Sequence, residues 1–157
     1  MRASFVGSAI KSSIYEVSNG ETKFIGILKN KKRITYKTTA GKHTFMVIAE
    51  SADFMEANLA EDKTYYSVIS PRMGLIKARF SMFPFRNDGT SKFHTESKEF
   101  EKLKKKTQEV LITDESKAWY DKKKKKFEKK RIKYWKKWKK KTAEEISEKT
   151  LNAEDGI

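Results

Sequence analysis

The sequence contains no cysteine and only two prolines among its 157 residues. The absence of cysteine excludes disulfides, thiolate metal sites, thiol catalysis and a cysteine-linked lipid anchor within this chain. It does not fix the redox compartment, because many exported proteins also lack cysteine. No apolar run is long enough for a signal peptide near the N-terminus or for a transmembrane helix elsewhere, and we therefore expect neither.

Catalytic motifs are also scarce. His43 and His94 are the only histidines, and no HxH or HExxH spacing exists. Glycines occur singly, so no glycine-rich phosphate loop is present. Asp53 and Glu56 are acidic, but their position next to a predicted strand break indicates turn or edge residues. The sequence therefore predicts a protein that is not an enzyme and that has no metal and no cofactor.

Positive charge is abundant and local. Charged residues make up 36% of the chain, apolar residues 37%, and the formal net charge is +15. Residues 122–141 contain 14 Lys/Arg and one acid, Glu128, which leaves a net charge of only +2 for the remaining chain. A charge of this size favours anionic partners such as nucleic acid, anionic lipid or acidic glycans.

Residues 1–94 predict a small antiparallel β-sandwich, because short runs with alternating polar and apolar residues are separated by turn signals. The clearest of these signals is Asn19-Gly20, a typical hairpin turn. A last turn is expected at residues 87–90. We expect strands at residues 12–17, 22–28, 33–38, 43–50, 55–60, 64–69 and 75–83.

Residues 95–157 predict a helical, lysine-rich extension with two helices, so the fold class is α+β. Thr95 can cap the first helix, and its apolar stripe is expected to run from Phe100 and Leu103 to Leu111 over about five turns. Thr113, followed by Asp114 and Glu115, can cap the second. That helix is expected to continue to about Lys149, a length of roughly 55 Å at 1.5 Å per residue.

The second helix carries the candidate binding residues. At 100° per residue four of its aromatic side chains share one stripe, Trp135 lies at the margin, and lysines cover the rest of the circumference. Four interpretations are open: a solvated tail whose aromatic rings lie against the first helix, an interfacial helix on anionic lipid, a helix that docks to a protein or to a second copy, and a binder of nucleic-acid phosphates. The candidate residues for an anionic surface or a partner are Tyr120, Lys123, Lys124, Phe127, Lys130, Arg131, Tyr134, Trp135, Lys137, Trp138 and Lys141.

Several segments of the N-terminal half carry a resemblance to a known family. They are FVGSAIKSSIYEV, FIGILKN, TTAGKHTFMVIAE, LAEDKTYYSVI and SPRMGLIKARF. In this order they resemble a family of uncharacterised bacterial lipoprotein domains related to the PEGA-like β-sandwich. The turn at residues 41–44 and the segment at residues 63–66 are its two signatures. The resemblance implies an immunoglobulin-like or PEGA-like sandwich in the bacterial cell envelope, and it supplies no catalytic residues.

Family members usually have a signal segment and a strand before the region that matches residues 2–7, and they lack the lysine-rich helix. We expect a non-enzymatic, envelope-associated binding or structural module, provided that an export signal precedes this chain. Its helix would contact an anionic membrane surface, a wall polymer or a protein partner. The alternative is a cytoplasmic protein that binds nucleic acid nonspecifically through the same helix.

Overall fold

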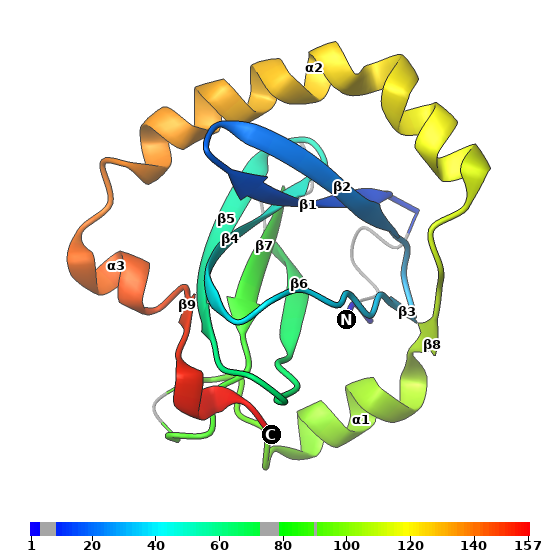
Figure 1. Cartoon of the computed structure of the whole chain (residues 1–157). Coiled ribbons are helices and arrows are strands. Elements are labelled where there is room, and N and C mark those ends of the chain that lie inside the picture. The colour runs from blue at the N-terminus through cyan, green and yellow to red at the C-terminus, as the bar shows by residue number, and fades with distance from the viewer. Residues whose placement is uncertain (4–8, 73–78, 90) are drawn as a thin grey trace.

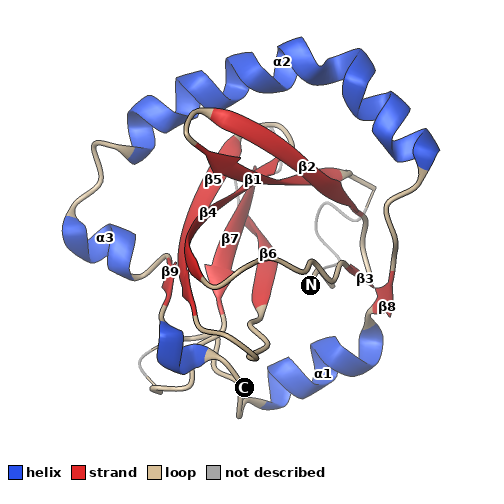
Figure 2. Cartoon of the chain, in the orientation of Figure 1, coloured by secondary structure: helices blue, strands red, loops and turns tan. Residues whose placement is uncertain are grey.

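The computed structural model describes residues 1–3, 9–72, 79–89 and 91–157. It shows an α+β chain with a mostly antiparallel five-stranded sheet, two small sheets, a long C-terminal helix and short helices (Figures 1 and 2). The large sheet has the order β2-β1-β4-β5-β9. Its strands are β1 (Ser12–Ser18), β2 (Glu21–Leu28), β4 (Gly41–Ile48), β5 (Ala52–Leu59) and β9 (Thr150–Leu151).

The predicted hairpin between β1 and β2 is confirmed. Ser18 pairs with Glu21 across the turn, and both Asn19 (φ 48°) and Gly20 (φ 81°) have the positive φ that this tight turn requires. A β-bulge follows, because Ile14 pairs with Gly26 while Tyr15 pairs with Phe24. The local sequence was therefore sufficient to fix this part of the sheet.

The five-stranded sheet is buried on both faces. Ile14, Val47 and Met55 point to one face, where they pack against β6 (Ser67–Arg72) and β7 (Arg79–Pro84). Tyr15 and Met46 point to the other face. Burial on both faces explains why β4 contains the continuous apolar run Phe45–Ile48 instead of strict alternation.

Strands β6 and β7 form an antiparallel two-stranded sheet against this first face. Pro71 and Arg72 belong to β6, although a break was predicted there. β6 begins only at Ser67, so residues 64–66 of the predicted strand lie outside it. The predicted strand at 75–83 is confirmed over Arg79–Phe83, and its first residues, 75–78, lie outside the described residues, as do residues 4–8 and 90.

The predicted strand at residues 33–38 is wrong in extent. β3 contains only Lys32–Arg33, and it pairs in parallel with β8 (Gln108–Glu109) from the C-terminal half. Conversely, β5 begins at Ala52 where a turn was expected, so Asp53 is a buried strand residue and not an edge residue.

The first helix, α1 (Lys98–Lys106), is shorter than predicted. Its N-cap is Ser97 and not Thr95, since the Ser97 Oγ accepts a hydrogen bond from the Phe100 amide at 3.1 Å. Phe100 and Leu103 pack against β6 and β7 residues, as an apolar stripe should. The expected continuation to Leu111 is wrong because the amides of Gln108 and Val110 bond to the carbonyls of Lys31 and Arg33, before and in β3, instead.

The long helix is α2 (Asp114–Trp138), and its predicted N-cap is confirmed: Thr113 and Ser116 form a reciprocal capping box. The predicted end near Lys149 is wrong. The chain leaves the helix after Trp138 and starts a new one, α3 (Ala143–Ser147), before β9 and the short helix η1 (Ala153–Asp155). From α1 onward the chain runs around the periphery of the strands (Figure 1).

The C-terminal half is part of the same core as the strands. β9 adds a parallel strand at the edge of the five-stranded sheet, next to β5. Helix α2 lies across the second face of that sheet and contacts β2 and β5. The lysine-rich segment is therefore held against the strands and does not form a detached tail.

Candidate anion-binding surface

The aromatic stripe of α2 faces the sheet. Tyr120 stacks on Phe24 with ring centroids 4.8 Å apart and an interplanar angle of 4°. At the other end of the helix Trp135 meets Phe54 edge-on at 5.0 Å. Stacked and edge-on ring pairs at these distances are the favourable geometries for aromatic side chains. The stripe therefore provides the hydrophobic face that fixes α2 on the sheet.

This burial removes the aromatic residues from the candidate binding surface. Tyr120, Phe127 and Trp138 are buried, and Tyr134 and Trp135 are partly buried against the same cluster. Their rings contact the chain's own strands, and not α1 as in the solvated-tail interpretation. An interfacial helix that inserts its aromatic rings into lipid requires those rings at the surface. In this geometry they cannot reach a bilayer unless α2 detaches.

Three of the predicted basic residues are engaged within the chain. The Lys130 ammonium donates to the carbonyl of Ala49, and the Arg131 guanidinium bonds to Glu128. The Lys141 Nζ lies 3.0 Å from Glu145 Oε1. Only the Lys130 contact joins α2 to the strand region, at Ala49 just after β4; the Arg131 pair lies within α2, and the Lys141 pair joins the segment after α2 to α3.

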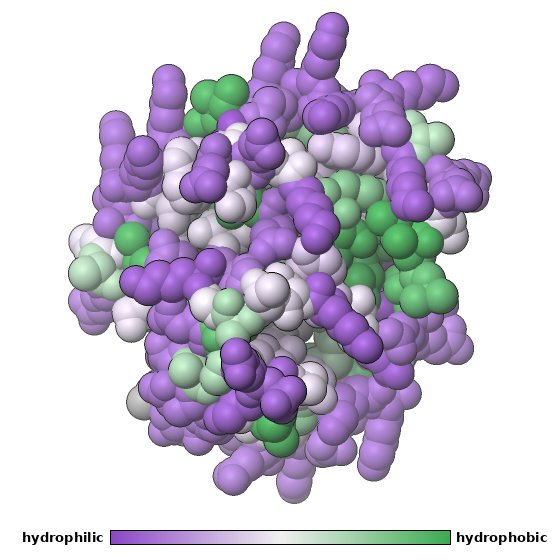
Figure 3. Space-filling view, viewed as in Figure 1, coloured by the Kyte–Doolittle hydropathy of each residue, from purple (hydrophilic) through white to green (hydrophobic). Residues whose placement is uncertain are grey.

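The other basic side chains face solvent and form what we call the lysine face. Three of the predicted residues belong to it: Lys123, Lys124 and Lys137. Hydrophilic side chains project from α2 along the top of the molecule in Figure 3. The lysine face comprises Lys122, Lys123, Lys124, Lys125, Lys126, Lys129, Lys133, Lys136 and Lys137, and the exposed Lys139 and Lys140 extend it.

All side chains of the lysine face carry positive charge, and they offer few other groups that could recognise one specific ligand. Lys122, Lys126, Lys129 and Lys133 recur at spacings of three and four residues, so they lie on one side of the helix, opposite the buried rings. Like charges at these spacings repel one another, and an apposed anionic surface would relieve that repulsion. The arrangement can neutralise many negative charges along about 24 Å, the length of the helical turns from Lys122 to Lys137.

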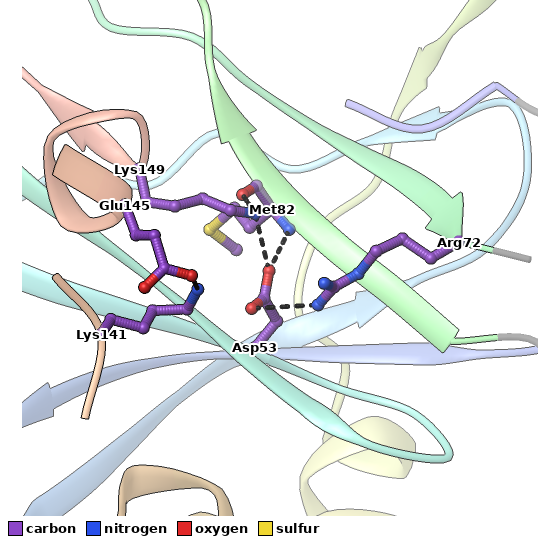
Figure 4. A network of polar contacts seen from close by, with 6 residues as sticks. All are labelled: Asp53, Arg72, Met82, Lys141, Glu145 and Lys149. Atoms are coloured by element: carbon purple, nitrogen blue, oxygen red, sulfur yellow. Dashed lines mark hydrogen bonds and ion pairs between the residues drawn. The ribbon is translucent and has the colours of Figure 1, made fainter. Parts of the chain in front are cut away.

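A second polar feature, which the sequence did not reveal, lies inside the protein. Asp53 of β5 and Lys149, just before β9, form a buried ion pair with Lys149 Nζ 2.9 Å from Asp53 Oδ2 (Figure 4). The same ammonium donates to the carbonyl of Met82 at 2.7 Å. The Met82 amide donates to Asp53, and Arg72 lies 3.3 Å from the other carboxylate oxygen.

The buried ion pair fixes the C-terminal segment to the sheet. Burial lowers the pKa of Lys149 below its ordinary value, and the charge and hydrogen bond of Asp53 oppose that change. Because each partner compensates the other, neither charge is left alone in the interior. The pair joins residues that are 96 positions apart, which explains why neither residue stood out in the sequence.

A third cluster lies beside an open hollow of about 940 Å³ that is lined by parts of β1, β2, β4 and β5. Glu16 accepts hydrogen bonds from Tyr36 and from His43, each at 2.5 Å. The other ring nitrogen of His43 lies 2.9 Å from the carbonyl oxygen of Thr39. The side chain of His43 is only 10% exposed.

The charge of Glu16 is stabilised in this cluster. Burial by itself would raise the pKa of Glu16, but the hydrogen bonds from Tyr36 and His43 and the charges of His43 and Lys23 lower it below the ordinary value. Both carboxylate oxygens and both imidazole nitrogens have hydrogen-bond partners within the chain. The cluster pins the segment after β3 to the sheet.

Within residues 1–3, 9–72, 79–89 and 91–157, the side chains of His, Asp and Glu form no group of three that could hold a metal ion. Over the same ranges, no helix combines the length and the apolar character needed to cross a bilayer.

Comparison with protein-family models, with curated proteins and with solved structures finds no match to this chain. The resemblance to the PEGA-like lipoprotein domains therefore stays a prediction. What the protein does has to be argued from its own geometry, and the lysine face is the most pronounced chemical feature of its described surface.

Proposed function

We propose that this protein is a non-enzymatic binding module that holds an extended anionic surface against the lysine face of α2. One observation carries the proposal: the aromatic residues of the helix are used inside the protein, while its lysines are turned to solvent. A helix held in this way presents a dense cationic surface without having to order itself on binding. The contact would be electrostatic, and it would weaken as salt screens the charges.

The setting that we propose is the bacterial cell envelope, in keeping with the resemblance in the N-terminal half. The finer description of the fold as an immunoglobulin-like or PEGA-like sandwich belongs to this proposal. Its support is the packing of β6 and β7 on one face of the five-stranded sheet, with Met55, Phe80 and Met82 in a shared core. In this arrangement the strands are the scaffold, and α2 is the part that meets the partner.

Nonspecific nucleic-acid binding is the second candidate. Lysines dominate the exposed face, and lysine suits the neutralisation of phosphates better than the bidentate reading of bases. This candidate predicts an affinity for duplex DNA that falls steeply with salt and depends little on sequence. It requires no envelope location.

A variant with four lysines replaced tests the proposal. In Lys122→Gln/Lys126→Gln/Lys129→Gln/Lys133→Gln the central lysine face loses its charge, while the buried stripe is untouched. Each lysine near an anionic surface contributes about 1 kcal/mol, so we expect binding at low salt to weaken by at least about tenfold. The measurement is co-sedimentation with vesicles of phosphatidylglycerol and phosphatidylcholine, in parallel with binding to duplex DNA.

The matched control removes the same charge elsewhere. Lys11→Gln/Lys29→Gln/Lys37→Gln/Lys98→Gln replaces four exposed lysines outside α2. The proposal requires this control to bind far better than the α2 variant. Equal losses in the two variants would show that net charge alone, and not the lysine face, drives binding. Absence of binding to both anionic vesicles and DNA at low salt would overturn both candidates.

A further inference from the structure

The segment that leads into α2 exposes two adjacent apolar side chains. Leu111 is 82% exposed and Ile112 is 42% exposed. Within the described part of the chain, Ile132 and Ile157 are the only other large apolar residues that are exposed. Figure 3 shows apolar surface gathered where β8 leads into α2, next to the hydrophilic side chains of the helix. Two adjacent exposed apolar residues beside a cationic helix suit a partner that offers both an apolar region and negative charge.

The exposed pair is held between two fixed points. On its N-terminal side, the Val110 amide donates to the Arg33 carbonyl at 2.9 Å, which ties the segment to β3. On its C-terminal side, Thr113 is locked by its capping box with Ser116. Leu111 and Ile112 are therefore presented by an anchored backbone, and little ordering is needed when they enter a partner.

Groups of lysines lie farther along the chain on both sides of the pair. Lys104, Lys105 and Lys106 end α1 and are exposed. The lysine face begins at Lys122 on the other side. Four exposed acids, Glu109, Asp114, Glu115 and Asp121, lie between these two groups of lysines, and Asp114 is paired with Lys117 at 3.2 Å. An anionic partner that approaches α2 would thus find two apolar side chains at the edge of the cationic surface.

We infer that the anionic surface is a lipid bilayer and that Leu111 and Ile112 are its insertion anchor. The inference rests on the proposed function and names the partner of the same surface. Cations hold the headgroups, and two apolar side chains enter the boundary between headgroups and acyl chains, the combination that peripheral membrane proteins use. A phosphate backbone would satisfy the lysines equally well but would leave Leu111 and Ile112 in water.

The absence of cysteine allows a direct test of insertion. Leu111→Cys provides a single site for a polarity-sensitive fluorophore, and Ile157→Cys provides a matched site at another exposed apolar residue. With vesicles of phosphatidylglycerol and phosphatidylcholine, we expect the label at position 111 to shift to the blue and to be quenched by brominated acyl chains. The label at position 157 should remain in water. A protein that binds these vesicles with the label at position 111 still in water would overturn the inference while leaving the proposed function intact.

A second variant separates the anchor from the charge. Leu111→Ser/Ile112→Ser should bind the same vesicles about tenfold more weakly, and its binding to duplex DNA should be unchanged. The Ile157→Ser control should bind vesicles like the parent protein. A parent protein that binds DNA but no vesicles would overturn the lipid assignment. A blue shift of the position 111 label that grows with protein concentration in the absence of vesicles would also overturn it, because a second copy would then cover the pair.

Discussion

Lys149 and Asp53 lie 96 residues apart in sequence, yet their side chains meet inside the protein with Nζ and Oδ2 separated by 2.9 Å. The lysine side chain is 9% exposed and the aspartate side chain 6%. Lys149 Nζ also lies 3.5 Å from the centroid of the Phe83 ring. This ion pair connects the residue before β9 with β5, and the bond from Lys149 to the Met82 carbonyl connects it with β7.

Removal of one partner of this pair should destabilise the protein strongly. Lys149→Met keeps most of the side-chain volume but leaves the buried Asp53 without its closest cation, and we expect a loss of about 3 kcal/mol in the free energy of unfolding. Urea denaturation followed by circular dichroism measures it. The double variant Asp53→Asn/Lys149→Met should recover much of the loss, because neither charge then remains buried. A double variant that is less stable than Lys149→Met would contradict this account.

The aromatic stripe of α2 should behave as core and not as a binding surface. Phe127 is 8% exposed and lies 6.0 Å from the Tyr15 ring, so Phe127→Ala should lower the free energy of unfolding by about 3 to 5 kcal/mol. The neighbouring Lys126→Ala should change it by no more than about 0.5 kcal/mol. Thermal and chemical unfolding of both variants provides the measurement. A Phe127→Ala protein as stable as the parent would mean that the helix does not pack on the sheet in solution.

Stability should fall in acid partly through Glu16. The pKa of Glu16 is lower in the folded protein than its ordinary value of 4.5, which approximates the unfolded chain. The contribution of Glu16 to the free energy of unfolding is thus complete above about pH 4.5, and it is lost as the pH falls through the lower pKa of Glu16 in the folded protein. The groups that face the carboxylate are Tyr36, His43 and Lys23.

The test compares the parent protein with Glu16→Gln. Unfolding by urea at about pH 7 and at about pH 3 should show a smaller loss of stability for Glu16→Gln, because the variant has no carboxylate to protonate at this position. Glu148→Gln, at an exposed residue after α3, is the control and should follow the parent. The same acid-induced loss in Glu16→Gln and in the parent would show that the cluster does not stabilise the charged carboxylate.

Salt should stabilise this protein. The lysine face concentrates like charges along one helix, and an increase of ionic strength from about 0.01 M to about 0.15 M shortens the screening length from about 30 Å to about 8 Å. We expect the melting temperature to rise over this range. The rise should be smaller in Lys122→Gln/Lys126→Gln/Lys129→Gln/Lys133→Gln than in the variant with four lysines replaced outside α2. A melting temperature that falls with added salt would show that attractive pairs outweigh the repulsion.

Signals carried by a few neighbouring residues were readable in the sequence. Asn19-Gly20 predicted the first hairpin, and Thr113 predicted the start of α2. A comparable signal was missed at the far end: Thr142 and Glu145 have the spacing of a capping box, and they mark the start of α3. This capping-box spacing predicts that the long helix ends before Thr142.

Other features depended on partners far along the chain. Val110 and Leu111 continue the apolar spacing of α1, but hydrogen bonds to β3 draw this segment out of the helix. The first residues of β5, around Asp53, looked like a turn before the predicted strand at 55–60, because the buried ion partner of Asp53 is close to the C-terminus. Local spacing cannot show such pairings, since the competing contact is supplied only when the chain has folded.

The sequence by itself determined that this protein concentrates its positive charge on one helix, that the helix carries an aromatic stripe, and that the N-terminal half is rich in strands. These properties follow from residue type and spacing alone. Only the tertiary structure decided that the stripe faces the protein's own sheet, where Tyr15, Phe24 and Phe54 offer an apolar surface of matching length. The physical reason is that burying aromatic area against these residues favours the folded chain, while the lysines keep their hydration by facing water.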